Sequence, residues 1–288
     1  ISLPNILRQS IELVSRFPLI AANAYAAKRH YFMGESLVLH NPSPELSVAE
    51  NLLRMMRPDQ SYTSEEAHLL DLMLILHAEH SSNNSTFVCR AISSSGSDTY
   101  SAIAGAVGSL KGPLHGGANA KVMRMYRDIC ANIGHTPDDA TLGAYLDRIL
   151  DGEVGDRSGK IYGLGHAVYT MSDPRAIVIQ KYAADLAREK GCLADLELME
   201  RIEQMGIEKI TKRKKLDIPM CANVDFYSGF VYDMLGIPED LFTPVFAVAR
   251  IAGWCAHRME EVATGGRIMR PAYRTALKTH EYIPLEAR

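Results

Sequence analysis

Apolar side chains recur along this chain every three or four residues, the spacing that places them on one face of an α-helix. Stretches in which β-branched residues alternate with polar ones, as a half-buried strand requires, are almost absent. We therefore expect an all-α protein in which short loops carry the functional motifs. The periodic segments predict helices over 4–16, 18–32, 99–110, 118–133, 195–210 and 243–262, and two more in the apolar runs after residues 50 and 66.

Residues that favour helix ends mark several of these boundaries. Asp173 followed by Pro174 predicts a helix start, and so does Thr136 followed by Pro137. A proline at position 18 lacks the amide hydrogen that a helix interior needs, so we expect a break there. Capping boxes ahead of an apolar run are predicted for two pairs, Ser47 with Glu50 and Thr63 with Glu66.

Length and composition exclude several classes of function. The chain has 288 residues, 47% of them apolar, which suits one large or two modest domains with a sizeable core. A net charge of −3 gives no sign of a nucleic-acid or membrane partner, and no apolar run reaches membrane-spanning length. Five scattered cysteines without a Cys-x-x-Cys pair predict neither disulfides nor zinc, so we expect a reducing cytoplasm. Because the chain begins with Ile1, we expect a fragment or a processed product.

The first histidine motif, His77-Ala-Glu-His80, closes an apolar helix. Residues three apart share a helix face, so zinc ligation is one interpretation. We expect no metal there, because a third ligand at a recognisable spacing and a nearby cysteine are both missing. The alternative for His77 is a histidine bonded to the last carbonyls of its helix. His80 lies at the exit into a polar loop, where it can face a cleft.

The second motif, Gly112-Pro-Leu-His115-Gly-Gly-Ala-Asn119, is the most specific of the set. Glycines let the backbone approach a ligand closely. The dipole of the helix that follows would favour a neutral imidazole at His115. Such an imidazole can donate its N–H to an enolate oxygen without carrying charge. The alternative interpretation is a tight turn in which the histidine only caps.

The third motif combines Gly163-Leu-Gly-His166 with Arg175 nine positions later. Arg175 falls in the first turn of a helix, where a cation opposes the helix dipole. Bidentate binding of a carboxylate ligand would offset that cost. The alternative is an ion pair between Arg175 and a nearby acid such as Asp173.

The remaining candidates are an aspartate, two arginines and a basic run. Asp225 lies among apolar and aromatic neighbours, which would raise its pKa and suit it to act as a base; the alternative is a helix N-cap. Arg250 falls on an otherwise apolar helix, and a buried arginine requires an anionic partner. Arg270 precedes a proline at a loop exit. The basic run over 212–215 is either a solvated surface turn or a phosphate contact.

Together these motifs resemble the citrate synthase family, in family order and spacing from about residue 21 to residue 274. The resemblance implies an all-α fold with a large and a small domain that close over the substrates, usually in a homodimer. On that basis residues 1–117 and 237–288 would form the large domain, and residues 118–236 the small one. The implied reaction condenses acetyl-CoA with oxaloacetate and hydrolyses citryl-CoA to citrate and CoA, with no cofactor because acetyl-CoA is a substrate.

The resemblance also implies a role for each candidate residue. Asp225 matches the base that takes a methyl proton from acetyl-CoA, and His115 matches the histidine that stabilises the enol. His166 matches the histidine that donates a proton to the oxaloacetate carbonyl. The residues that match ligands of oxaloacetate are His80, Arg175, Arg250 and, delivered from the partner subunit, Arg270.

Two departures from the family pattern affect the expected site. Thr170 stands where many members carry Lys or Arg against a CoA phosphate. The contact would then come from one of four lysines, Lys160, Lys212, Lys214 or Lys215. Roughly the first third of a typical member is also missing, which affects the dimer core. Alternatives to citrate synthase are a 2-methylcitrate synthase, a citryl-CoA lyase and an inactive fragment with a role in assembly. The intact segments Asp173-Pro-Arg175 and Val224-Asp-Phe-Tyr-Ser-Gly229 disfavour the lyase.

Overall fold

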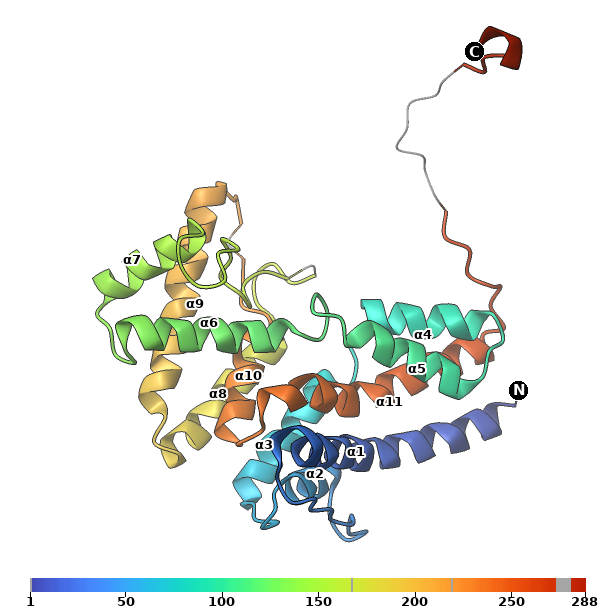
Figure 1. Cartoon of the computed structure of the whole chain (residues 1–288), viewed down its shortest axis with the longest axis horizontal. Helices are drawn as coiled ribbons and strands as arrows, with labels where there is room; N and C mark the ends of the chain where they lie inside the picture. The colour runs from blue at the N-terminus through green and yellow to red at the C-terminus, as the bar shows by residue number, and fades with distance from the viewer. Residues whose placement is uncertain (1, 167, 219, 273–280) are drawn as a thin grey trace.

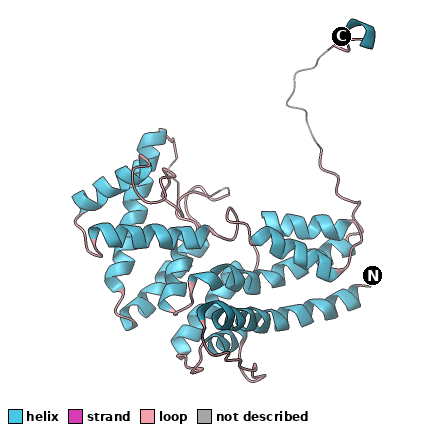
Figure 2. Cartoon of the chain, viewed as in Figure 1, coloured by secondary structure: helices cyan, strands magenta, loops and turns pink. Residues whose placement is uncertain are grey.

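The computed structural model describes residues 2–166, 168–218, 220–272 and 281–288. Across these ranges all regular secondary structure is helical, as Figure 2 shows. The nearest approach to a sheet is a single antiparallel bridge between Leu164 and Ala222. The all-α prediction is therefore confirmed.

Eleven α-helices and two short 3-10 helices are present in the described part of the chain. In chain order they are α1 (Leu3–Met33), α2 (Val48–Met56), α3 (Ser64–His77), α4 (Asn84–Ser94), α5 (Thr99–Leu110), α6 (Ala118–Ile133), α7 (Asp139–Leu150), α8 (Pro174–Glu189), α9 (Leu193–Lys214), α10 (Val224–Met234), η1 (Glu239–Leu241), α11 (Phe242–Ala263) and η2 (Leu285–Ala287).

The helices form two groups that lie next to each other (Figure 1). In one group α1 packs against α2 and α11, and α4 and α5 pack against each other and against α11. The other group contains α6 to α10, with α10 packed on both α6 and α8. Helix α3 crosses from the first group to α8 in the second. The division into a large and a small domain at residues 117 and 236 stays a prediction.

Two apolar cores hold these groups together. The larger core joins buried side chains of α2 and α3 with those of α6 to α11, so it runs through both groups. The smaller core lies between α4, α5 and the middle of α11, around the fully buried Trp254. Because a buried indole removes a large apolar area from water, Trp254 anchors this side of α11.

The predicted break at Pro18 is wrong. One helix runs from Leu3 to Met33 with Pro18 buried inside it. A proline removes only one backbone hydrogen bond, and this long helix packs along α2 and α11, so tertiary burial outweighs the local loss. The expected start at Thr136 is also displaced, since α7 begins at Asp139 with Asp138 as its N-cap.

Other helix boundaries agree with the sequence. Both predicted capping boxes are present, at the starts of α2 and α3. Helix α8 begins at Pro174 with Asp173 as N-cap, and α6 covers the predicted residues 118–133. Helices α4 and α10 were not predicted as helices.

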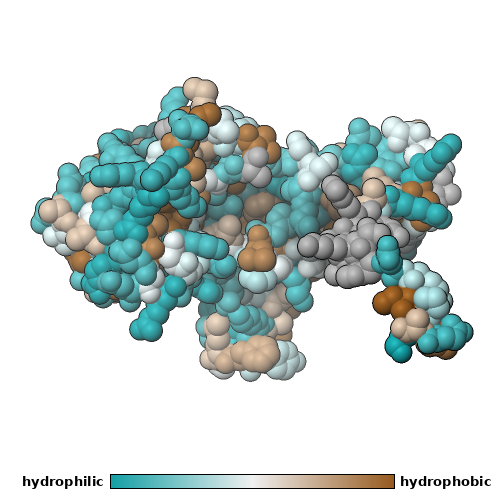
Figure 3. Space-filling model, turned by 90° about the horizontal axis from the view of Figure 1, so that it is seen from above, coloured by the Kyte–Doolittle hydropathy of each residue, from teal (hydrophilic) through white to brown (hydrophobic). Residues whose placement is uncertain are grey.

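Most of the surface visible in Figure 3 is hydrophilic, with apolar side chains scattered between polar ones. Scattered exposed apolar residues are ordinary for a folded protein surface. Among the described residues, no helix is both long and apolar enough to cross a membrane.

Candidate active site

The sequence motifs lie at the ends of helices that meet where the two groups join. His80 follows α3, His115 precedes α6, and Asp225 lies in the first turn of α10. Arg175 lies in the first turn of α8, and Arg250 lies midway along α11. His80 and His115 therefore lie in loops, as the sequence predicted for the motifs, whereas Asp225, Arg175 and Arg250 lie on helices.

The loop before His166 is joined directly to the segment that leads into α10. Its backbone pairs with residues 221–223 through Gly165 N–H to Cys221 O at 2.7 Å and Asn223 N–H to Gly163 O at 2.9 Å. Gly163 has a φ of +80°, and a Cβ there would lie 2.7 Å from the Phe226 ring, so only glycine suits this position. This pairing fixes the His166 loop beside the start of the helix that carries Asp225.

His166 is held in one tautomer by its own loop. The amide N–H groups of Val168 and Tyr169 both donate to His166 Nδ1, at 2.9 and 3.1 Å. In the neutral ring the proton is therefore on Nε2, which faces an Arg175 guanidinium nitrogen at 3.5 Å. Burial, and after it Arg175, lowers the pKa of His166, although Asp173 opposes the shift. Two donors that face each other suit an oxygen acceptor placed between them.

His80 completes one wall of this site with an aromatic neighbour. Its ring lies edge-on to His166 with the ring centres 5.2 Å apart, and Tyr169 lies 5.6 Å from it. Burial, followed by Arg175, lowers the pKa of His80. His80, His166 and Arg175 are thus brought together, as the sequence predicted.

Arg175 makes the ion pair that the sequence left as its alternative role. Its Nε and Nη2 donate to the two carboxylate oxygens of Asp173, at 3.0 and 2.7 Å. Asp173 is buried and also accepts from the Val224 amide at 3.1 Å, which links α8 to α10. The arginine side chain keeps 11% exposure and points Nη2 at His166, so the pair orients the guanidinium toward the site. Its role as an oxaloacetate ligand stays a prediction.

His115 meets the start of a helix other than the expected one. Its Nε2 lies 3.3 Å from the amide nitrogen of Ser85 and 2.9 Å from the Ser85 hydroxyl, in the first turn of α4. The expectation that α6 supplies the dipole at His115 is therefore corrected to α4. An N–H donated to Nε2 leaves the proton on Nδ1, and the positive end of α4 opposes a second proton. Burial, followed by Arg250, lowers the pKa of His115 in agreement with a neutral ring.

Asp225 is not an N-cap. That position belongs to Asn223, whose side chain accepts from the Asp225 amide at 3.0 Å. No hydrogen bond reaches the Asp225 carboxylate from the described part of the chain. Burial raises the pKa of this carboxyl to about 6, and Arg175, Asp173 and Arg250 act on it from nearby. A carboxylate with that pKa and free oxygens is suited to accept a proton near neutral pH.

Arg250 is a buried cation at the centre of these groups. It is 2% exposed, its Nε donates to the His77 carbonyl at 2.6 Å, and its guanidinium stacks on Phe246. Within the described ranges no carboxylate lies at ion-pair distance from it. Burial, followed by the neighbouring positive charge of Arg175, lowers the pKa of Arg250 to about 10. A desolvated cation of this kind calls for an anionic ligand.

His77 takes the structural role that the sequence offered as its alternative. Its Nδ1 bonds the Met73 carbonyl at 2.8 Å, and burial lowers its pKa to about 4. No cluster of three or more metal-ligating side chains occurs among the residues that were placed. Gly253 of α11 allows this segment to lie close, because a Cβ there would stand 2.2 Å from the Ala78 carbonyl oxygen.

Five of the candidate cations lie outside this cluster. Arg270 is exposed in the segment after α11, whose Met269 bonds Ser94 at the end of α4, while His115 meets Ser85 at the start of that helix. Lys160 is exposed beside a hollow of about 730 Å³ that Tyr162 also lines. The other three, Lys212, Lys214 and Lys215, are exposed at the end of α9. The structure does not bring these lysines to the histidine cluster, so their proposed contact with CoA stays a prediction.

Sequence reasoning missed two residues that shape the site. Ser85 contacts His115, and Tyr169 contacts both His80 and His166. The polar run before Ser85 is a recognisable helix start, with Asn83 as N-cap, and could have predicted α4. Nothing in the local sequence marks Tyr169 as a neighbour of the histidines.

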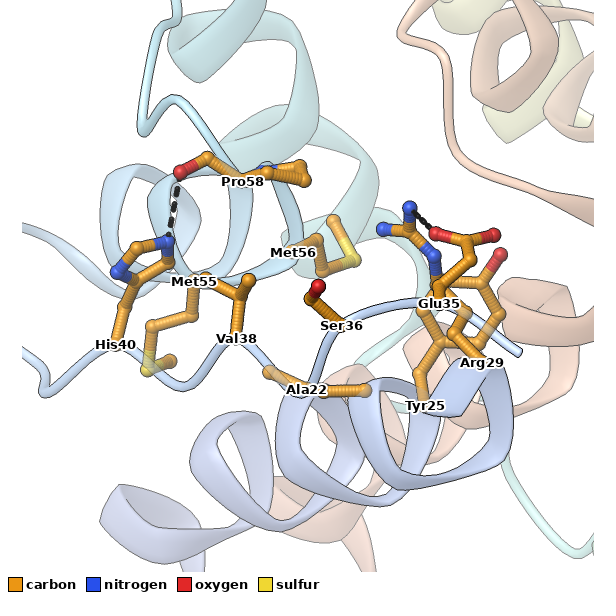
Figure 4. A pocket seen from close by; sticks show the side chains of 11 residues that line it. Ala22, Tyr25, Arg29, Glu35, Ser36, Val38, His40, Met55, Met56 and Pro58 are labelled. Carbon is orange, nitrogen blue, oxygen red and sulfur yellow. Dashed lines mark hydrogen bonds and ion pairs between the residues drawn. The ribbon is translucent and has the colours of Figure 1, made fainter. Parts of the chain in front are cut away.

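Another hollow lies away from this cluster. It has a volume of about 600 Å³ between the end of α1, the loop after it and α2. Arg29 is paired with Glu35 there, and His40 bonds the Pro58 carbonyl (Figure 4). The two oppositely charged side chains that line it, Arg29 and Glu35, are paired with each other.

Comparison with known proteins places this arrangement in a family. The family model described as "Citrate synthase, C-terminal domain" matches residues 3–272. A citrate synthase of Deinococcus radiodurans is 38% identical over 97% of this chain and 68% of its own length. Citrate synthase 2 of Bacillus subtilis is 37% identical over 98% of this chain and 68% of its own length.

Solved structures agree with these relatives. Citrate synthase from Pyrobaculum aerophilum superposes with a TM-score of 0.78 at 33% identity, over 98% of this chain and 65% of that one. A citrate synthase of Thermoplasma acidophilum, solved as a ternary complex with carboxymethyl coenzyme A and oxaloacetate, superposes with a TM-score of 0.74 at 30% identity, over 97% of this chain and 68% of that one.

The chain belongs to the citrate synthase family, whose members are acyltransferases. It spans about two thirds of the length of the relatives that it matches.

Proposed function

We propose that this chain carries the citrate synthase reaction, the condensation of acetyl-CoA with oxaloacetate and the hydrolysis of citryl-CoA. The observation that carries the proposal is Arg250, a buried cation without a carboxylate partner among the described residues, near His80 and His115, whose pKa values burial lowers. An anionic substrate would supply the missing charge. Family membership supports the same reaction.

The proposed oxaloacetate site consists of hydrogen-bond donors. Arg250 and Arg175 would bind its carboxylates, and His80 would add a further contact. The Nε2–H of His166 would donate to the ketone oxygen, because Nδ1 is already occupied by two backbone amides. Donors aimed at an oxygen that gains charge stabilise the transition state more than the ground state.

The proposed acetyl-CoA chemistry uses Asp225 and His115. The Asp225 carboxylate takes a methyl proton while the Nδ1–H of His115 donates to the thioester oxygen, which gives the enol form. The enol carbon then attacks the oxaloacetate ketone carbon, and His166 supplies the proton to the new alkoxide. Water cleaves the citryl thioester to citrate and CoA. Each proton-transfer or oxyanion group is typically worth about 10²–10⁴ in rate.

The wider assembly is also part of the proposal. We expect a homodimer in which Arg270 serves the neighbouring subunit's site, since the segment that carries Arg270 lies at the opposite end of α4 from His115. The CoA phosphates would meet Lys160 or the basic end of α9, and no cofactor is needed. A cytoplasmic location agrees with the bacterial relatives.

Release of free CoA thiol tests this proposal directly. We expect thiol from acetyl-CoA when oxaloacetate is present and almost none without it. Propionyl-CoA in the same assay separates a 2-methylcitrate synthase, which would use it as well as or better than acetyl-CoA. A dimeric preparation that releases no thiol from either acyl-CoA would contradict the proposal and support a role in assembly.

A further inference from the structure

A buried charge network lies at the far end of α3 and α8 from the histidines. Glu66, in the first turn of α3, accepts from Arg57 Nη1 at 2.6 Å and from Lys190 Nζ at 2.6 Å. The other guanidinium nitrogen of Arg57, Nη2, donates to the Leu235 carbonyl at 2.6 Å. One carboxylate thus joins the end of α2, the start of α3, the end of α8 and, through Arg57, the end of α10.

The network differs from an ordinary surface ion pair because its carboxylate is buried and both of its oxygens are bound by cations. The Glu66 side chain is 5% exposed, whereas Arg57 and Lys190 are 21% and 31% exposed. Burial alone would raise the pKa of Glu66, but hydrogen bonds from Arg57, Lys190 and the Thr63 amide lower it to about 2. Because a buried pair loses far more than a surface pair when one partner is removed, each member holds the others in place.

Helices α3 and α8 lie side by side and run in opposite directions. Glu66 at the start of α3 contacts Lys190 at the end of α8, and His68, also near the start of α3, lies against Tyr182 in the middle of α8. At the other end, His80 after α3 lies against His166, which faces Arg175 in the first turn of α8. Sixteen residues of α8 span about 24 Å, so the charge network and the histidines occupy opposite ends of one helix pair.

We propose that Glu66 and Lys190 are positioning residues that seat α8 on α3 and thereby bring His166 and Arg175 up to His80. This inference rests on the proposed function, since it assigns the two residues to oxaloacetate binding at a distance. Neither side chain touches the site. Their effect is on the fraction of molecules in which the two halves of the oxaloacetate site face each other.

A loss of that seating has a specific kinetic signature. When only a fraction of the protein is competent, the apparent affinity for a ligand falls by that fraction, while saturating ligand restores the competent arrangement. We expect Lys190→Met to raise the KM for oxaloacetate about tenfold and to leave kcat within about twofold. Lys190→Arg keeps the cation and should restore most of the affinity.

The control is an ion pair of similar length in another place. Lys28 bonds Asp240 at 2.6 Å and joins α1 to η1, away from α8. Lys28→Met should change the melting temperature by no more than Lys190→Met does and leave the KM for oxaloacetate unchanged. A merely structural role for Lys190 would instead give a lower melting temperature with an unchanged KM, and that result would overturn the proposal.

A second readout works without turnover. Amide hydrogen exchange should quicken in Lys190→Met over the first turn of α8 and the segment around 168–173, about 24 Å from the substitution along the helix. Unchanged exchange there would also overturn the inference. If wild-type protein releases no CoA while the exchange effect is present, the proposed function fails and the seating of α8 by Lys190 stands.

Discussion

Replacement of Asp225 by asparagine should remove activity and stabilise the fold at the same time. Burial raises the pKa of Asp225 from 3.8 to about 6, so its charged form is held unfavourably in the folded protein. At about 1.4 kcal/mol per pH unit, that difference amounts to about 3 kcal/mol. Because the side chain is partly exposed, solvent lowers the expected gain to about 1–3 kcal/mol. Asparagine has the same shape and no charge to desolvate.

The pH dependence follows from the sign of this difference. Between pH 3.8 and about 6 the folded carboxyl binds more protons than the unfolded one, so wild-type stability falls as pH rises through that window. The asparagine variant lacks this loss. Its advantage should therefore be near zero below pH 3.8 and full above pH 6. Wild-type turnover should rise through the same window, because the base acts only when it is ionised.

Urea unfolding at pH 4 and pH 8 measures the stability, and CoA thiol release at pH 8 measures the activity. The matched control is Asp71→Asn, since Asp71 is another partly buried helical aspartate, on α3. We expect turnover to fall by about 10²–10⁴ for Asp225→Asn only. Equal stability of wild type and Asp225→Asn at pH 8, or turnover within tenfold of wild type, would refute the reasoning.

Three further substitutions separate the roles in the site. His115→Ala should lower turnover by about 10²–10³ and change the Kd for oxaloacetate little; a collapse of affinity with turnover intact would make it a binding residue. Arg175→Lys should raise the Kd for oxaloacetate measured by calorimetry, because an ammonium group cannot make both hydrogen bonds to Asp173 and also face His166. An unchanged Kd would mean that Arg175 serves only in its ion pair with Asp173. Arg250→Met should abolish oxaloacetate binding while the free energy of unfolding stays within about 1 kcal/mol of wild type, since the unliganded cation is poorly solvated; retained binding would remove Arg250 as the anion ligand.

The sequence predicted most of the helices because their periodicity and caps are local signals. The capping box of Thr63 and the Asp173-Pro174 pair each mark a helix start through contacts within four residues of the chain. Pro18 shows where local reasoning stops, since α1 continues through it only because α2 and α11 cover the helix. Helix α4 is not predicted by apolar periodicity, because it starts in a polar run that is equally typical of a loop.

The candidate site was predicted as a set of residues but not as a set of contacts. The motifs named His80, His166, Asp225 and Arg250, and the fold brings them to one place. That Ser85 of α4 meets His115, thirty residues later in the chain, depends on how α4 and the 111–117 loop pack. The sequence also left open whether Asp225 is a base or a helix N-cap, and the structure shows that Asn223 is the N-cap.

We infer that oxaloacetate bridges the two helix groups and so completes the site for the thioester. Arg250 and His80 belong with the first group, and His166 and Arg175 belong with the second. A ligand that binds both groups shifts the protein toward the closed arrangement, and linkage requires the reverse effect of the same size. Titration of the unreactive analogue carboxymethyl-CoA, on protein whose dimeric state has been confirmed, tests this claim most directly. We predict tighter binding of the analogue when oxaloacetate is present, whereas equal affinities with and without oxaloacetate would contradict the claim.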